Sequence, residues 1–303
     1  MTDFLHHPDL FLPPLIAGIM LAAACSVVSV LVILKRLAFI GQGISHAGFG
    51  GVGLAAFLAY GVSGSRGTGF DSIAADLIVF LFCLATGLAI AALSRRKHVK
   101  IDTAIGILLV AAMAFGILLE QLRWQLVNLP WYQSLTQGRQ LTGINWHAVL
   151  FGSILNVTRT DMWWSLAVSI IVLLIFIIMA KEIIFFSFDE KVSQVFGVPA
   201  GFIHYLTLII MSILVVFTMK ITGLILVNAF LVIPGATATL LSKRINKVII
   251  LSLAVGETGV IAGFLLAFAL GGNLPVGPII VLLLALQFAA AWTWNRYRSR
   301  NSL

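Results

Sequence analysis

Long apolar runs separated by short polar segments follow one another along nearly the whole chain. A helix needs about 20 apolar residues to cross the hydrocarbon core of a bilayer. The pattern predicts nine such spans, at about 11–34, 44–60, 73–93, 103–121, 163–183, 200–219, 222–241, 247–270 and 276–295. The second of them is short and rich in glycine. The predicted fold class is therefore all-α, a polytopic membrane protein with about nine transmembrane helices.

The stretch 122–162, between the fourth and fifth spans, has mixed polarity. Within it, residues 146–157 are apolar but too few to span, which favours a short re-entrant or interfacial helix. Residues 122–144 are expected to form an external insertion. No shift in composition marks a boundary, so residues 1–303 are expected to form a single transmembrane domain.

The composition agrees with a membrane protein and excludes several other classes. Hydrophobic residues make up 60% of the chain and charged residues 10%, whereas soluble domains carry about 25% charged residues. The two cysteines lie in apolar runs, so neither a disulfide framework nor a cysteine zinc site is expected. The chain has no phosphate-binding G-x-x-x-x-G-K-[ST] motif, and the glycines of GFGGVG (48–53) favour close helix packing. We expect no enzymatic activity in this chain.

Basic residues fall between the apolar runs and predict the orientation of the chain. If the loop with Arg95, Arg96, Lys97 and Lys100 faces the cytoplasm, a nine-span path puts most of the 19 basic residues on that side. Cytoplasmic loops carry an excess of Lys and Arg. The N-terminus is therefore predicted outside and the C-terminus in the cytoplasm.

Polar residues inside the spans are candidates for a transport pathway. Gln42 and His46 are four residues apart and share one helix face, with Ser45 beside them. Histidine within a span by default marks a pathway, and imidazole is a favoured ligand of transition metals. A histidine that serves helix packing alone is the equally weighted alternative.

Three residues of later spans are weaker candidates. Glu257 lies well inside a span, where a carboxylate is paired, protonated or facing water. Asn228 and Pro234 share the seventh span, and Pro234 is predicted to kink it and free backbone carbonyls. Those carbonyls could line a pathway, although a kink that serves packing alone is as common.

A short helix is predicted at about 187–198, between the fifth and sixth spans. Its acidic start suits a helix N-terminus, and a glycine ends it. The spacing of its apolar residues makes one small apolar face, suited to docking in a groove of a partner. A helix lying on the membrane surface is the alternative. The residues assigned to this segment are Phe188, Asp189, Glu190, Val192, Val195, Phe196 and Gly197.

Several motifs occur in the same order as in a known family. They include KRLAFIGQGISHAGFGGVGLA (35–55), DTAIGIL (102–108), LFGSIL (150–155), SFDEKVSQVFGVPAGFIHYL (187–206), MKITGLILVNAFLVIPGATATLL (219–241) and NLPVGPIIVLLLALQF (273–288). The chain resembles the permease subunits of metal-ion ABC transporters of the zinc, manganese and iron class. The resemblance covers most of the chain.

The resemblance implies a homodimeric permease of the prokaryotic cytoplasmic membrane, with a cytoplasmic ABC ATPase and an extracytoplasmic metal-binding protein as partners. It implies a transported divalent metal, with zinc or manganese expected ahead of iron, and no permanently bound cofactor. The segment 187–198 resembles the coupling helix that contacts the ATPase, and His46 resembles the pathway histidine of the family.

The chain departs from the family pattern at Gln42, where G-D-A-x-S-H-A commonly has an aspartate. An amide carries no negative charge, whereas hard and borderline cations favour carboxylate. The cargo could therefore be a metal chelate instead of a bare ion. A more distant alternative is an ion-gradient-driven carrier that uses Glu257 as its protonatable group.

Overall fold

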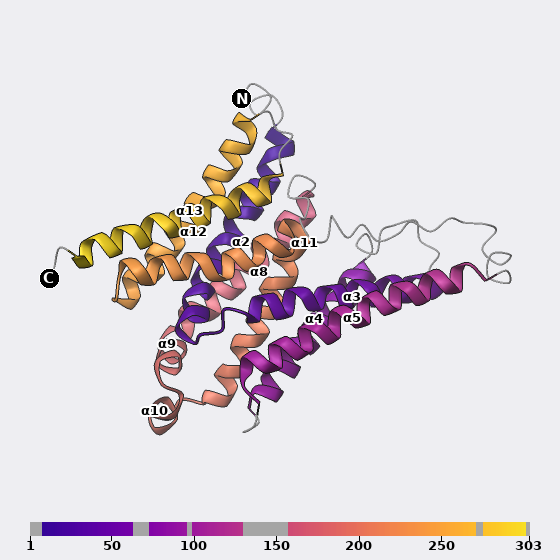
Figure 1. Cartoon of the computed structure of the whole chain (residues 1–303), viewed down its shortest axis with the longest axis horizontal. Coiled ribbons are helices and arrows are strands. Elements are labelled where there is room, and N and C mark those ends of the chain that lie inside the picture. The colour runs from indigo at the N-terminus through magenta and orange to yellow at the C-terminus, as the bar shows by residue number, and fades with distance from the viewer. Residues whose placement is uncertain (1–7, 63–72, 96–98, 130–156, 271–274, 301–303) are drawn as a thin grey trace. The chain divides into compact units, whose positions relative to one another are not determined.

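The computed structural model describes residues 8–62, 73–95, 99–129, 157–270 and 275–300. All the regular elements in these ranges are helices, drawn in Figure 1. They are α2 (Pro8–Leu34), α3 (Ile40–Val62), α4 (Ile73–Ser94), α5 (Ile101–Val127), α8 (Arg159–Ile178), α9 (Ala180–Phe188), α10 (Glu190–Val195), α11 (Ala200–Leu241), α12 (Ile245–Ala269) and α13 (Val276–Arg300).

Eight segments of the described residues are long and apolar enough to cross a membrane. They lie in α2, α4, α5, α8, α12 and α13, and two of them lie in α11. The prediction of an all-α polytopic membrane protein is confirmed. The count of nine is not confirmed, because α3, which contains the predicted span 44–60, is a helix of 23 residues but is not among the eight.

The span predicted at about 163–183 is present in the structure, with its ends at Arg159 and Ile178. Helix α8 begins at Arg159, because the Thr158 hydroxyl accepts the Asp161 N–H while the Asp161 carboxylate accepts the Thr158 N–H. This reciprocal capping box satisfies two backbone donors that a helix start otherwise leaves unpaired. The helix ends at Ile178, and the separate helix α9 follows.

The predicted helix at 187–198 is shorter in the structure. Residues 187 and 188 close α9, and α10 has six residues. The predicted insertion at 122–144 begins within α5, and its part from 130 onward lies outside the described residues. The apolar segment 146–157 lies outside them except for its last residue.

The chain divides into two compact units, 1–41 with 147–303 and 42–146. In the first unit, α2 packs against α8, α11 and α12 (Figure 1). Its span is 72% buried. Small residues allow this close approach. The Ser252 hydroxyl donates to the Ser26 carbonyl at 2.6 Å, and a Cβ on Gly256 would collide with the Ser26 hydroxyl. Packing of small residues with interhelical hydrogen bonds is how helices associate in lipid.

Helix α11 contains two spans, Ala200–Met219 and Ile221–Leu241, as the apolar pattern predicts. The one residue of α11 with non-helical torsions is Gly223, at φ 80° and ψ 166°, close to the start of the second span. Residues with a side chain rarely adopt a positive φ, which explains the glycine at this position. The kink predicted at Pro234 stays a prediction. There, the Gly235 N–H donates to the Ser29 hydroxyl at 2.9 Å, which ties this turn to α2.

In the second unit, α3 and α5 approach each other through glycine. A Cβ on Gly53 would collide with the backbone of Gly116, and one on Gly116 with the backbone of Phe49. Gly50 likewise faces the carbonyl of Ala112. The glycine run 48–53 is therefore a packing surface, as the sequence predicts.

Candidate functional site

His46 lies two turns into α3, and its Nδ1 atom is buried with no hydrogen-bond partner among the described residues. Its ring stacks on Phe49, with ring centroids 5.8 Å apart and planes 12° apart. A buried polar atom without a partner costs about 1–3 kcal/mol. A ligand that accepted or supplied a bond at this nitrogen would remove that cost, so His46 is suited to bind something the chain itself does not supply.

Gln42 and Ser45 differ in their availability. Gln42 is exposed and lies one turn before His46 on the same face of α3. Ser45 is fully buried, and its hydroxyl donates to the Gln42 carbonyl at 3.2 Å. The hydroxyl of Ser45 is thus used inside the helix. The side chains of Gln42 and His46 are the better pair of candidate ligands.

Asn228 lies in the first unit, close to the residue that precedes Gln42. A Cβ on Gly41 would lie 3.2 Å from the Asn228 side-chain oxygen and 2.8 Å from Leu231. The Asn228 amide donates to the Leu224 carbonyl at 2.9 Å. The absence of a side chain at Gly41 lets α11 approach the start of α3 at Asn228.

Glu257 lies half-buried in α12. Asn228 and Glu257 belong to the first unit, whereas Gln42, Ser45 and His46 belong to the second. Across the described ranges no group of three or more His, Cys, Asp or Glu side chains could hold a metal ion.

Another carboxylate, Glu120 of α5, is neutralised locally. Arg123 Nε lies 3.1 Å from its Oε2, and Trp124 Nε1 donates to its Oε1 at 3.2 Å. Both Glu120 and Arg123 are buried. This pairing within one helix accounts for the charge of Glu120 without a transported ion.

The segment from Asp189 to Gly197 forms a capped helix with exposed apolar side chains. The Asp189 carboxylate accepts the N–H groups of Lys191 and Val192, at 2.8 and 3.0 Å. Gly197, at φ 81°, closes the helix through a bond from its N–H to the Gln194 carbonyl. Glycine in this conformation is the usual end of a helix.

The apolar side chains of this segment face outward. Val195 is 84% exposed and Phe196 73% exposed, although the Phe196 ring also meets Phe185 edge-on at 5.6 Å. Phe188 and Val192 are exposed as well. We call Phe188, Val192, Val195 and Phe196 the α10 apolar face. These four exposed apolar side chains on one short segment are a candidate interaction surface.

A cluster at the base of α10 was missed by the sequence analysis. Lys35 follows the last residue of α2, and its Nζ lies 3.4 Å from the centre of the Phe186 ring and 3.9 Å from Glu190 Oε2. Burial lowers the pKa of Lys35, while the carboxylates of Glu190 and Asp189 raise it, and burial prevails. No sequence signal could pair residues so far apart, and Lys35 by itself indicated only orientation.

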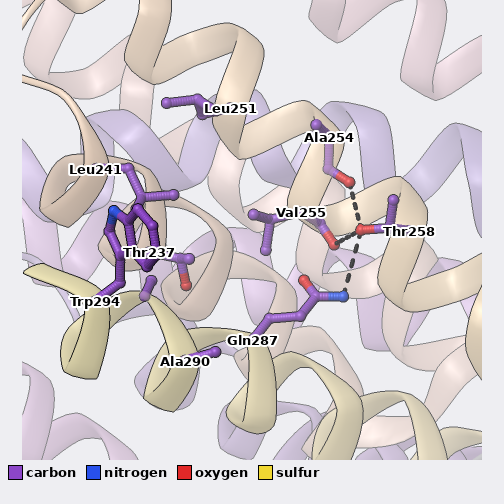
Figure 2. A pocket seen from close by; sticks show the side chains of 10 residues that line it. Thr237, Leu241, Leu251, Ala254, Val255, Thr258, Gln287, Ala290 and Trp294 are labelled. Carbon is purple, nitrogen blue, oxygen red and sulfur yellow. Dashed lines mark hydrogen bonds between the residues drawn. The ribbon is translucent and has the colours of Figure 1, made fainter.

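A pocket of about 550 Å³ lies between α11, α12 and α13 (Figure 2). The Thr258 hydroxyl donates to the Ala254 carbonyl at 2.6 Å and lies 3.3 Å from the Gln287 amide nitrogen. The lining carries no carboxylate, imidazole or thiol and does not suit a bare cation. It comprises Thr237, Leu241, Leu251, Ala254, Val255, Thr258, Gln287, Ala290, Ala291 and Trp294.

Comparison with known proteins agrees with the all-helical fold. The model of the ABC 3 transport family matches residues 8–295. The chain belongs to this family, and it is an integral membrane protein of the permease type. The predicted family is thereby confirmed.

Individual relatives are similar over nearly their whole length. The manganese transport system membrane protein MntC of Halalkalibacterium halodurans is 34% identical over 282 residues, covering 93% of this chain and 86% of the relative. The chelated iron transport system membrane protein YfeD of Yersinia pestis is 27% identical, covering 94% of this chain and 85% of the relative. The solved structure of PsaBC from Streptococcus pneumoniae in complex with Fab matches with a TM-score of 0.73 at 28% identity, covering 96% of this chain and 94% of that chain.

Proposed function

We propose that the protein is the transmembrane permease subunit of an ATP-driven ABC importer that moves a divalent transition metal ion across the cytoplasmic membrane. Family membership over residues 8–295 carries this proposal. The proposed cargo is manganese or zinc, with iron third, and relatives named for manganese and iron transport support a metal. Residues 1–303 are proposed to act as one permease domain without enzymatic activity.

The proposed pathway residues of the second unit are His46 and Gln42, with Ser45 beside them. Asn228 and Glu257 are the proposed pathway residues of the first unit. The unpartnered Nδ1 of His46 supports this assignment, because a neutral imidazole nitrogen is a good ligand for manganese, zinc and iron. Pro234 is proposed to free a carbonyl in the same pathway. The metal is cargo, so a weak and incomplete ligand set suits the function better than a closed site.

The contact between Lys35 and Glu190 supports the proposed topology. Two side chains that meet beyond the ends of the spans lie on one side of the membrane, so an even number of crossings separates them. Of the described helices between them, α4, α5 and α8 qualify as spans, and α3 would be the fourth crossing. We therefore include α3 as the ninth span, with the N-terminus outside and the C-terminus in the cytoplasm.

In this orientation the α10 apolar face points toward the cytoplasm. It is proposed to dock on an ABC ATPase subunit, while an extracytoplasmic metal-binding protein delivers the ion to the opposite side. The permease is proposed to act as a homodimer. The exposure of Val195 and Phe196 supports a docking role, because a protein surface that covered them would bury their apolar area.

Uptake by reconstituted vesicles tests the proposal. The permease is reconstituted with its ATPase, and the metal-loaded binding protein is added outside with radioactive manganese or zinc. Uptake should require enclosed ATP and should stop with an ATPase variant that binds ATP but does not hydrolyse it. Uptake without ATP that collapses with an uncoupler would instead establish a gradient-driven carrier, and Glu257→Gln would then abolish it.

A second candidate cargo is a metal chelate. Gln42 favours it, because an amide offers an oxygen but no charge to a bare cation. The relative YfeD is named for chelated iron. Mass spectrometry of the cargo released from the purified binding protein separates the two candidates: a bare metal supports the first, and an organic ligand in equal amount supports the second.

A further inference from the structure

Lys35 joins the end of α2 to the helices around α10. Its side chain is 17% exposed, and its amine lies between the Phe186 ring and the Glu190 carboxylate. An ammonium over an aromatic face is attracted by the ring, more strongly when water is excluded. One side chain therefore contacts both α9 and α10.

The backbone holds Lys35 firmly in this position. The Arg36 N–H bonds the Ile33 carbonyl at 3.1 Å, and the Leu37 N–H bonds the Val32 carbonyl at 2.8 Å. This pair of bonds is the Schellman motif, with Arg36 at the left-handed position, φ 57°, where glycine is usual. The carbonyls at the end of α2 also favour a cation there. Lys35 is thus presented by a rigid helix end.

The other side of the contact is equally fixed. Phe186 is 2% exposed, and its ring meets the His204 ring of α11 edge-on, with centroids 6.4 Å apart. Glu190 is the first residue of α10, directly after the capping residue Asp189. A displacement of α10 would therefore change the distance between Glu190 and the Lys35 amine, because the Phe186 ring that the amine also contacts is held between helices.

A short stretch of chain connects Lys35 to α3, the helix that contains the candidate pathway residues. After the turn that follows Lys35, α3 begins at Ile40, whose N–H bonds the Leu37 carbonyl at 2.9 Å. Gln42 and His46 occupy the first two turns of α3. The residue that contacts α10 and the residues of the candidate pathway are therefore neighbours along one short, hydrogen-bonded piece of chain.

We propose that Lys35 is a positioning residue for coupling, which transmits movement of α10 to the start of α3 through its contacts with Phe186 and Glu190. This inference rests on the proposed function, in which α10 docks on the ATPase. The competing explanation is a static contact that only holds the fold together. The two explanations predict different results for a variant that lacks the Lys35 charge but still assembles with the ATPase: only the coupling role predicts less metal transported per ATP.

The test uses the complete complex of permease, ATPase and binding protein in vesicles. Lys35→Met removes the charge and keeps an unbranched apolar stem. We expect it to bind the ATPase as wild type does and to allow ATP hydrolysis, while metal ions transported per ATP fall by about tenfold, a common size of coupling between sites. Lys35→Arg should restore the ratio, because guanidinium also sits over aromatic rings and pairs with carboxylate.

Arg36→Met is the matched control, since it removes an exposed neighbouring charge and should leave the ratio unchanged. If Lys35→Met transported as many metal ions per ATP as wild type, the inference would be overturned. Equal losses of transport per ATP in Lys35→Met and Arg36→Met would overturn it as well. If Lys35→Met is absent from the membrane, Glu190→Gln is measured instead, and a wild-type ratio there overturns it equally. Failure of the proposed function is distinguishable, because it shows as wild-type permease that neither binds the ATPase nor takes up metal.

Discussion

The segment Asp189–Gly197 and the segment Gln42–His46 are incomplete in opposite ways. The first satisfies its backbone at both ends with Asp189 and Gly197 but leaves the α10 apolar face exposed. The second is a helix whose apolar side chains are covered, but it leaves the buried Nδ1 of His46 without a partner. A missing apolar cover is supplied by a protein surface, whereas a missing polar partner is supplied by a small ligand. This difference is the reason why we propose a protein partner for one segment and an ion for the other.

The largest effect is expected at His46. His46→Ala should lower metal uptake by at least about 100-fold, since loss of even a supporting partner of a metal ligand costs 10–100-fold. Binding of the ATPase should persist, because the change lies outside the docking segment. Uptake of radioactive metal and co-purification of the ATPase measure the two effects.

Thr86→Val is the control for His46→Ala. Thr86 is also buried in the second unit, but its hydroxyl donates to the Phe82 carbonyl of its own helix at 2.9 Å. Its loss should leave uptake near the wild-type level. Normal uptake in His46→Ala would break the comparison, since the unpartnered nitrogen would then have no role in transport.

The next effect is expected at the α10 apolar face. Val195→Asp together with Phe196→Asp places two charges where an apolar contact is expected, and should weaken ATPase binding by about 30-fold, corresponding to an interface hot spot of about 2 kcal/mol. Binding is measured by titrating the ATPase onto the permease in detergent. Gln194→Asp adds a charge at another exposed position of the same helix and should change binding little. Equal weakening by Gln194→Asp would mean that general charge, and not the apolar face, governs docking.

The fold was largely predictable because burial in lipid leaves a local signal. Eight of the nine predicted apolar runs correspond to eight spans of the structure. The start of α8 could also have been found, since Thr158 and Asp161 form a recognisable capping pair. The end of α8 at Ile178 carries no glycine or proline and could not. The gap predicted between two apolar runs, at 220–221, lies just before the break in α11 at Gly223, which the apolar pattern does not predict.

The candidate site was predictable in part, and for a physical reason. The caps of α10 are contacts within a few residues, so the acidic start and Gly197 predicted them. The unpartnered state of His46 depends on which side chains surround it in space, and the Lys35–Glu190 contact joins distant residues. The sequence contains neither kind of information, because any of the acidic residues could have paired with Lys35.

A change at Gln42 sharpens the assignment of the ion. Gln42→Asp introduces a carboxylate one turn from His46, where attraction between unit charges at ~4 Å is about 1–4 kcal/mol depending on exposure. Since about 1.4 kcal/mol is tenfold in affinity, the KM for a bare divalent metal should fall by roughly tenfold. A neutral chelate would gain nothing. A KM that is unchanged for manganese, zinc and iron alike would contradict a bare-ion pathway at this face.

The smallest effect concerns the cap that lets α10 stand exposed. A Cβ added at Gly197 meets nothing within 4 Å, and the same holds for Gly106 in the interior of α5. The two glycines differ in backbone conformation, since Gly197 alone of the pair has a positive φ, 81°. Gly197→Ala should therefore destabilise the local fold by about 1–2 kcal/mol, whereas Gly106→Ala should stabilise its helix by about 0.5–1 kcal/mol. Thermal unfolding in detergent measures both changes in stability. Because Gly197→Ala loosens the helix end that carries Phe196, this variant should also bind the ATPase more weakly.

Changes in stability of opposite sign, with ATPase binding weakened only by Gly197→Ala, would tie docking to the rigidity of α10. A stabilising Gly197→Ala would instead show that this helix end does not need a residue with positive φ.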